Sequence, residues 1–222
     1  MLINWNRLLA RYQMERGGHF FGGSTNDCDS HLLLPQEERH PLLVWFDTDP
    51  SGRYSVRTLK ARTMVQLDGK YELYIRSRTV VSKGVAGLMG AVGKQDFGYP
   101  EATRGRFITT NNKPFTKQVL GDLELRNSLQ RREKEYLHIE PGPQGDGWHV
   151  VEIGADSFEG MTKDSSVWVP EAVRRTESIL FMSEEEQEVL WKAASEHFNL
   201  QMDEFLTFLR AAQRAVTTWR MT

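Results

Sequence analysis

The alternation of apolar and polar residues between Leu59 and Arg78 constrains the fold more than any other feature of this sequence. Asp68 and Gly69 mark a turn, since glycine readily adopts the positive φ that a tight hairpin needs. A three-residue loop, 67–69, aligns the apolar residues on one face, whereas a two-residue loop shifts the register by one residue and places Val65 opposite Glu72. We therefore predict a β-hairpin over 60–78. Its apolar face is Leu59, Ala61, Thr63, Val65, Tyr71, Leu73 and Ile75.

The opposite face of this hairpin is a candidate anion-binding surface. Its basic side chains can pair with phosphates or carboxylates, and its tyrosine ring can stack on a nucleobase. The candidate residues are Lys60, Arg62, Tyr74, Arg76 and Arg78. Exposed strands also carry bases for solubility and to discourage edge pairing. Nucleic acid is a possible partner but is not favoured, because this face holds a single aromatic residue.

The charge distribution is uneven although the net charge is only −2. Residues 53–94 hold nine bases against two acids, a charge of +7, so the remaining residues sum to −9. Residues 184–222 hold seven acids and four bases. The electrostatic field of such a charge distribution can steer an acidic partner. The charges can also be neutralised when segments of the chain pack together.

Periodicity along the chain favours an α+β fold with a mainly antiparallel sheet partly covered by a helix. An amphipathic helix is predicted over 2–12, and strands over 42–46, 54–59 and 106–110. Asn111 and Asn112 can cap a following helix with Pro114 in its first turn. A second hairpin is predicted from strands 136–140 and 148–153.

The pattern of the C-terminal residues predicts a helical hairpin. Ser183 and Glu186 form a capping box, and two apolar stripes follow it on either side of Asn199, where we expect the helix to break. The predicted organisation is an N-terminal helix and glycine-rich loop (1–41), a sheet domain (42–182) and the helical hairpin (183–222). The hairpin must bury its seam on the sheet or on another copy of the chain, so a homo-oligomer is possible.

No motif identifies a reaction, a metal or a cofactor. The glycine-rich segment 82–98 lacks the spacing of a phosphate-binding loop, and neither GxSxG nor HExxH occurs. Cys28, His31 and His40 match no standard zinc spacing. His138 is expected opposite His149 in the second hairpin, on the face away from Leu137, Ile139, Trp148 and Val150; such pairs are usually polar partners rather than metal ligands. The chain therefore reads as a binding protein rather than an enzyme.

The run from Arg106 to Asn111, through Leu120 and 123–126 to 137–139, resembles a pattern in an uncharacterised family of bacterial α+β domains of unknown function. The pattern is a strand, a short polar break, a helix ending in a leucine-rich turn, and another strand. The resemblance covers at most residues 53–153 and rests mainly on apolar positions. It implies an antiparallel α+β domain and assigns no catalytic residue.

The amino-acid composition indicates the class of protein and the cellular compartment in which we expect it. A hydrophobic content of 39% and a charged content of 26% are ordinary for a soluble protein. Apolar runs are too short for a membrane span or a signal peptide, and one cysteine fits a reducing compartment. We expect a cytoplasmic bacterial binding protein that contacts an anionic partner, protein or other, through the basic strand face. The alternatives are an enzyme of unfamiliar type with a pocket under 82–98, and an oligomeric structural subunit.

Overall fold

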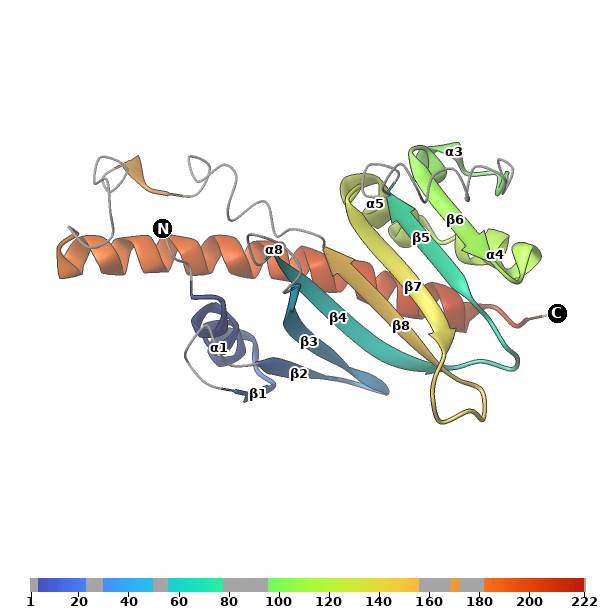
Figure 1. The fold of residues 1–222 in the computed structure, drawn as a ribbon, viewed down its shortest axis with the longest axis horizontal. Helices are drawn as coiled ribbons and strands as arrows, with labels where there is room; N and C mark the ends of the chain where they lie inside the picture. Colours follow the sequence, from blue (N-terminus) through green and yellow to red (C-terminus); the bar gives the residue numbers. More distant parts are fainter. Residues whose placement is uncertain are drawn as a thin grey trace. The chain divides into compact units, whose positions relative to one another are not determined.

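The computed structural model describes residues 4–22, 30–49, 56–77, 96–155, 169–171 and 182–221. They form an eight-stranded antiparallel sheet with the strand order β1-β2-β3-β4-β8-β7-β5-β6, together with helices (Figure 1). This confirms the predicted α+β class. Among the described residues, no helix combines the length and the hydrophobicity needed to cross a membrane.

The elements follow the chain with these bounds: α1 (Trp5–Arg16), β1 (His19–Phe21), β2 (His31–Gln36), β3 (Arg39–Asp49), β4 (Val56–Gln66), β5 (Leu73–Ser77), α3 (Pro100–Thr103), β6 (Arg106–Thr110), α4 (Lys113–Val119), α5 (Leu123–Arg131), β7 (Glu135–Pro141), β8 (Trp148–Ala155) and α8 (Glu184–Thr218).

The chain forms two compact units. Unit 1 comprises residues 1–35, 43–59 and 157–205, and unit 2 comprises residues 36–42, 60–156 and 206–222. Each unit is described by itself below.

Unit 1 is built around the apolar side of α1. The predicted N-terminal helix is present, and Asn4 caps it by accepting a hydrogen bond from the backbone N–H of Arg7. Trp5 packs on Phe46 of β3, with ring centroids 5.2 Å apart, and the buried Tyr12 meets Phe198 of α8 edge to face. The hydroxyl of Tyr12 donates to Asp203 at 2.6 Å, which fixes α1 on α8 within this unit.

The predicted helical hairpin is wrong, because the C-terminal residues form one continuous helix of 35 residues. The capping box at its start is confirmed, with Ser183 and Glu186 exchanging hydrogen bonds. Asn199, the expected break, is buried, and its side-chain amide donates to the carboxylate of Glu15 on α1. Asparagine disfavours helices mainly by competing for nearby backbone groups, so a partner on another helix removes the reason for the break.

In unit 2, the predicted division of side chains between the two faces of the sheet is confirmed, but the hairpin over 60–78 is wrong. The inner residues of β4 and β5 are buried, whereas Arg62 and Arg76 are exposed. However, β4 and β5 are not neighbours, because β8 and β7 lie between them (Figure 1). Alternation determines which way a side chain faces, and it does not determine which strand lies next to it.

The segment 67–72 crosses from β4 to β5. Three interstrand spacings of about 4.8 Å require roughly 14 Å, and six extended residues reach up to roughly 20 Å. The backbone N–H of Leu67 donates to the carbonyl of Gly147 at 2.9 Å. The buried backbone N–H of Tyr71 donates to Nε2 of His149 at 3.0 Å, and His149 Nδ1 lies 2.9 Å from the Gly147 carbonyl. His149 is therefore a structural histidine, and its two ring nitrogens hold the crossing segment against β8.

The second predicted hairpin is confirmed, with β7 and β8 pairing antiparallel across the loop 142–147. Its predicted register is wrong: His138 lies opposite Glu152, and His149 lies opposite Pro141. His149 is buried on the inner face, so Trp148 and Val150 lie on the outer face with His138.

Two helices of unit 2 begin at polar caps, of which the one at Asn112 was predicted. Asn112 caps α4 by accepting from the N–H of Phe115, and Asp122 caps α5 by accepting from that of Leu125. Residues 206–218 of α8 lie on the inner face, behind the strands in Figure 1. There the buried Gln213 donates to Thr63 of β4 at 3.1 Å, so the polar pair is satisfied within the core.

One buried charge lies on β6. The guanidinium of Arg106 donates to three backbone carbonyls at the end of α5 and the start of β7: Glu135 at 2.8 Å, Leu129 at 2.7 Å and Arg132 at 2.6 Å. Burial lowers the pKa of Arg106, which nevertheless keeps its charge at neutral pH.

We expect His149→Leu to destabilise the chain by about 1–3 kcal/mol, because it leaves the Tyr71 N–H buried without an acceptor at little change in volume. Urea unfolding followed by circular dichroism measures the loss. His19→Leu, at an exposed histidine on β1, is the control. Equal stability of the two variants would contradict the structural role of His149.

A second prediction concerns Asp122 and Arg214, whose side chains form hydrogen bonds of 2.9–3.2 Å. Burial opposes ionisation of Asp122, but the bonds from Arg214 and Leu125 outweigh it and lower its pKa. A lowered carboxyl pKa stabilises the fold above the unfolded-state pKa, about 3.9, and this contribution disappears as the pH falls through the folded-state value. Arg214→Gln should therefore cost about 1 kcal/mol at pH 7, and less at acid pH. Arg210→Gln is the exposed control on the same helix.

Candidate binding face of the sheet

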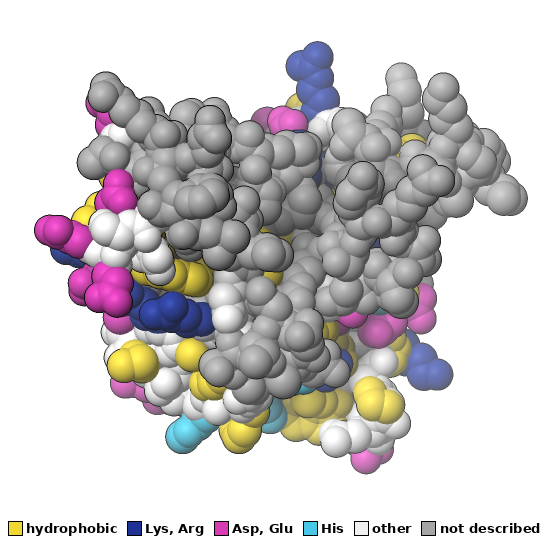
Figure 2. Space-filling model, turned by 60° about the vertical axis from the view of Figure 1, so that its left-hand side comes forward, with side chains coloured by type: hydrophobic (Ala, Val, Ile, Leu, Met, Phe, Trp, Pro, Cys, Tyr) yellow, Lys and Arg dark blue, Asp and Glu magenta, His cyan; other side chains and the backbone are white. Residues whose placement is uncertain are grey.

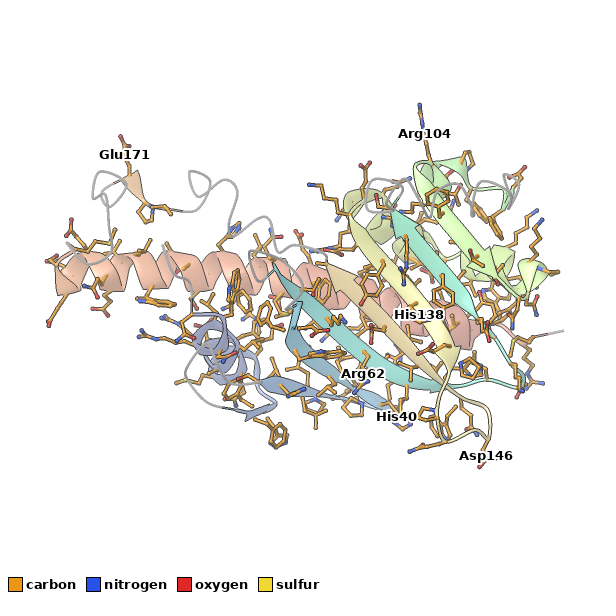
Figure 3. The ribbon with its side chains drawn as sticks, in the orientation of Figure 1. His40, Arg62, Arg104, His138, Asp146 and Glu171 are labelled. Carbon is orange, nitrogen blue, oxygen red and sulfur yellow. The ribbon has the colours of Figure 1, made fainter. Side chains whose placement is uncertain are left out.

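The outer side chains of β5, β7 and β8 in unit 2 form a cluster that we call the tyrosine–histidine face. Strand register brings its members together: Tyr74 lies opposite His138, and His138 lies opposite Glu152. The face comprises Tyr74, Arg76, Tyr136, His138, Glu140 and Glu152. Figure 3 labels His138 on β7 in this cluster.

Two of these rings form a close pair. The ring centroids of Tyr74 and His138 lie 3.8 Å apart with their planes tilted by 36°. Both side chains are half-buried. Partial burial, followed by the carboxylates of Glu140 and Glu72, raises the pKa of Tyr74, so its phenol stays protonated at neutral pH.

The ring of Tyr136 lies flat on the sheet over Gly154, its partner across the β7–β8 pair. A Cβ atom at position 154 would fall 2.2–2.4 Å from two ring carbons and the hydroxyl oxygen of Tyr136, so only glycine leaves room for the ring there. The Tyr136 hydroxyl donates to Glu152 at 2.8 Å and fixes the ring in this position. One side of the ring therefore lies against the backbone of Gly154, and the side chain is half-buried.

Arg76 connects the two tyrosines. Its guanidinium carbon lies 6.0 Å from the ring centroid of Tyr74 and 5.9 Å from that of Tyr136, at the outer limit of a cation–π contact. The side chain is exposed. A cation positioned between two rings can contact a negative group on a molecule whose planar parts stack on those rings.

His138 is surrounded by charge of both signs. Its Nε2 lies 3.2 Å from a carboxylate oxygen of Glu140. Burial lowers the pKa of His138 and Arg76 adds to this effect, whereas Glu140, Glu152 and Glu72 act in the opposite direction. At neutral pH the imidazole is therefore mainly uncharged, and protonation adds a positive charge to the face below its ordinary pKa of about 6.5.

The predicted anion-binding residues that the structure describes lie on this side of the sheet, on two strands that are not adjacent. Lys60 and Arg62 are on β4, Tyr74 and Arg76 are on β5, and Arg78 lies outside the described residues. Figure 3 labels Arg62 on β4. Because β7 and β8 lie between them, Glu140 and Glu152 also belong to this side. In the space-filling view, acidic, basic and hydrophobic side chains are interspersed on the described surface (Figure 2).

The other histidine candidates do not form a shared metal site among the described residues. His138 and His149 lie on opposite faces of the sheet. The ring of His31 stacks on Trp45 in unit 1, and that of His40 meets Trp148 edge to face in unit 2. Cys28 and most of the glycine-rich segment 82–98 lie outside the described residues, as does any pocket beneath that segment.

Sequence reasoning missed Tyr136, Glu152 and the role of Gly154. The signal is a tyrosine and a glycine on paired strands, and it becomes readable only when the register of the hairpin is known. A one-residue error in that register, as made for His138 and His149, moves a residue to the other face.

Comparison of the chain with protein-family models, with curated proteins and with solved structures gives no match. The functional interpretation of the tyrosine–histidine face therefore depends on its geometry alone.

The packing of Tyr136 on Gly154 predicts a strong coupling between the two positions. Gly154→Ala should displace the ring and cost about 1 kcal/mol or more, whereas in a Tyr136→Ala background the same change should cost little. Thermal or urea unfolding of the four proteins in this cycle measures the coupling. Additive effects would show that the ring does not depend on the missing Cβ.

Proposed function

We propose that this chain is a binding protein whose tyrosine–histidine face holds single-stranded nucleic acid. Tyr136 and Tyr74 stack on bases, and Arg76 contacts a phosphate. The supporting observation is the ring of Tyr136, which Gly154 and Glu152 hold flat on the sheet. Proteins often bind unpaired nucleobases through half-exposed aromatic rings on an antiparallel sheet, with basic side chains nearby.

This proposal is narrower than an anionic partner in general. An acidic peptide would use Arg62 and Arg76 but would gain little from a ring fixed parallel to the sheet. Every nucleobase has a planar face that can stack on such a ring. Glu140 and Glu152 oppose phosphate binding, so we expect modest affinity and the weak salt dependence of a site with few phosphate contacts.

Fluorescence anisotropy with a labelled single-stranded RNA oligonucleotide tests the proposal, with the duplex form as a comparison. Tyr136→Leu should weaken binding by about tenfold, since one stacked base is worth roughly 1–3 kcal/mol. Arg76→Gln should weaken binding and lower the salt dependence by about one phosphate contact. Arg104→Gln, at an exposed arginine outside the face, is the matched charge control (Figure 3). Equal affinities in all three variants would refute the proposal.

A pH series gives a second prediction. Because burial lowers the pKa of His138, the face gains a positive charge only as the pH falls below about 6.5. Affinity for the oligonucleotide should therefore rise between pH 7 and pH 5, and His138→Gln should reduce this rise. An identical pH profile in the variant would exclude His138 as its source.

A further inference from the structure

A cavity of about 380 Å³ lies in unit 1, between α1 and the first turns of α8. This volume is within the range of sites for small ligands. The residues that line it are Arg7, Arg11, Glu184, Gln187, Glu188, Trp191 and Lys192. None of them belongs to the tyrosine–histidine face.

The two helices contribute opposite charges to this cavity. Arg7 and Arg11 lie one helical turn apart on α1, so both project from the same side of that helix. Glu184 and Glu188 have the same spacing on α8. The cavity therefore has a pair of guanidinium groups from α1, and a pair of carboxylates together with the ammonium group of Lys192 from α8.

These charges do not neutralise each other across the cavity. The guanidinium of Arg7 lies over the ring of Trp191, 4.5 Å from its centroid, and Arg11 pairs with Glu15 of its own helix at 3.2 Å. In the part of the chain that the structure describes, no ion pair joins Glu184 or Glu188 to either arginine. The half-buried Trp191 also lines the cavity and adds an apolar surface to it.

We propose that this cavity binds a free α-amino acid. The carboxylate of the ligand pairs with Arg7 and Arg11, whose planar donors match its geometry, and the ammonium group pairs with Glu184 and Glu188. The side chain packs on Trp191. A simple anion would meet two carboxylates, and a simple cation would meet two arginines and Lys192, so a molecule with both charges satisfies the site best.

Isothermal titration calorimetry of the full chain with each standard amino acid tests this inference. We expect at least one amino acid with an apolar or aromatic side chain to bind. Two analogues of each binder, the amine without its carboxylate and the acid without its amino group, should each bind about tenfold or more weakly, because each loses a charge-assisted contact. Comparable binding of the acid analogue would show a simple anion site and would overturn the proposal.

Variants assign the binding to the cavity. Arg7→Gln and Glu188→Gln should each reduce affinity by about tenfold. Glu185→Gln is the matched control, because Glu185 is exposed in the same first turn of α8 but does not line the cavity. Trp191→Phe should remove the ligand-induced change in tryptophan fluorescence while binding persists. The proposal fails if no amino acid binds at millimolar concentration, or if the cavity variants bind as the control does.

Discussion

The outer face of unit 2 depends on the β7–β8 hairpin, which lies between two strands that follow each other in the chain. If β4 and β5 were neighbours, Lys60 and Arg62 would lie beside Tyr74 and Arg76 on a basic surface. The inserted hairpin separates them, adds Glu140 and Glu152, and places Tyr136 and His138 next to β5. His149 holds the crossing segment that makes this arrangement possible.

Local patterns predicted the fold class, the faces of the strands and the starts of several helices. Alternation and capping act over a few residues, so Asn112 and Ser183 could be interpreted from their neighbours alone. Strand order and the continuity of α8 depend on distant residues. The hydrogen bond from Asn199 to Glu15 joins positions that are far apart in the chain, and no local pattern reports it.

The candidate site was predicted only in part, because some of its features depend on strands that are distant in the sequence. Tyr74 and Arg76 could be found from their place on the outward side of a strand. Tyr136 could not, because its significance comes from Gly154 on the next strand and from the register that joins them. The α1–α8 cavity was not predicted, because its walls come from segments that are distant in the sequence.

The buried arginine on β6 has a consequence for self-association. β6 is the last strand in the order, and the terminal strand of a sheet is a template for pairing with another molecule. Arg106 points inward, and its guanidinium binds carbonyls at the end of α5 and the start of β7. An inward-facing charge on a terminal strand disfavours edge-to-edge pairing with a strand of another molecule. The residue that binds β6 to its own chain is therefore also of the kind that limits strand pairing at the end of a sheet.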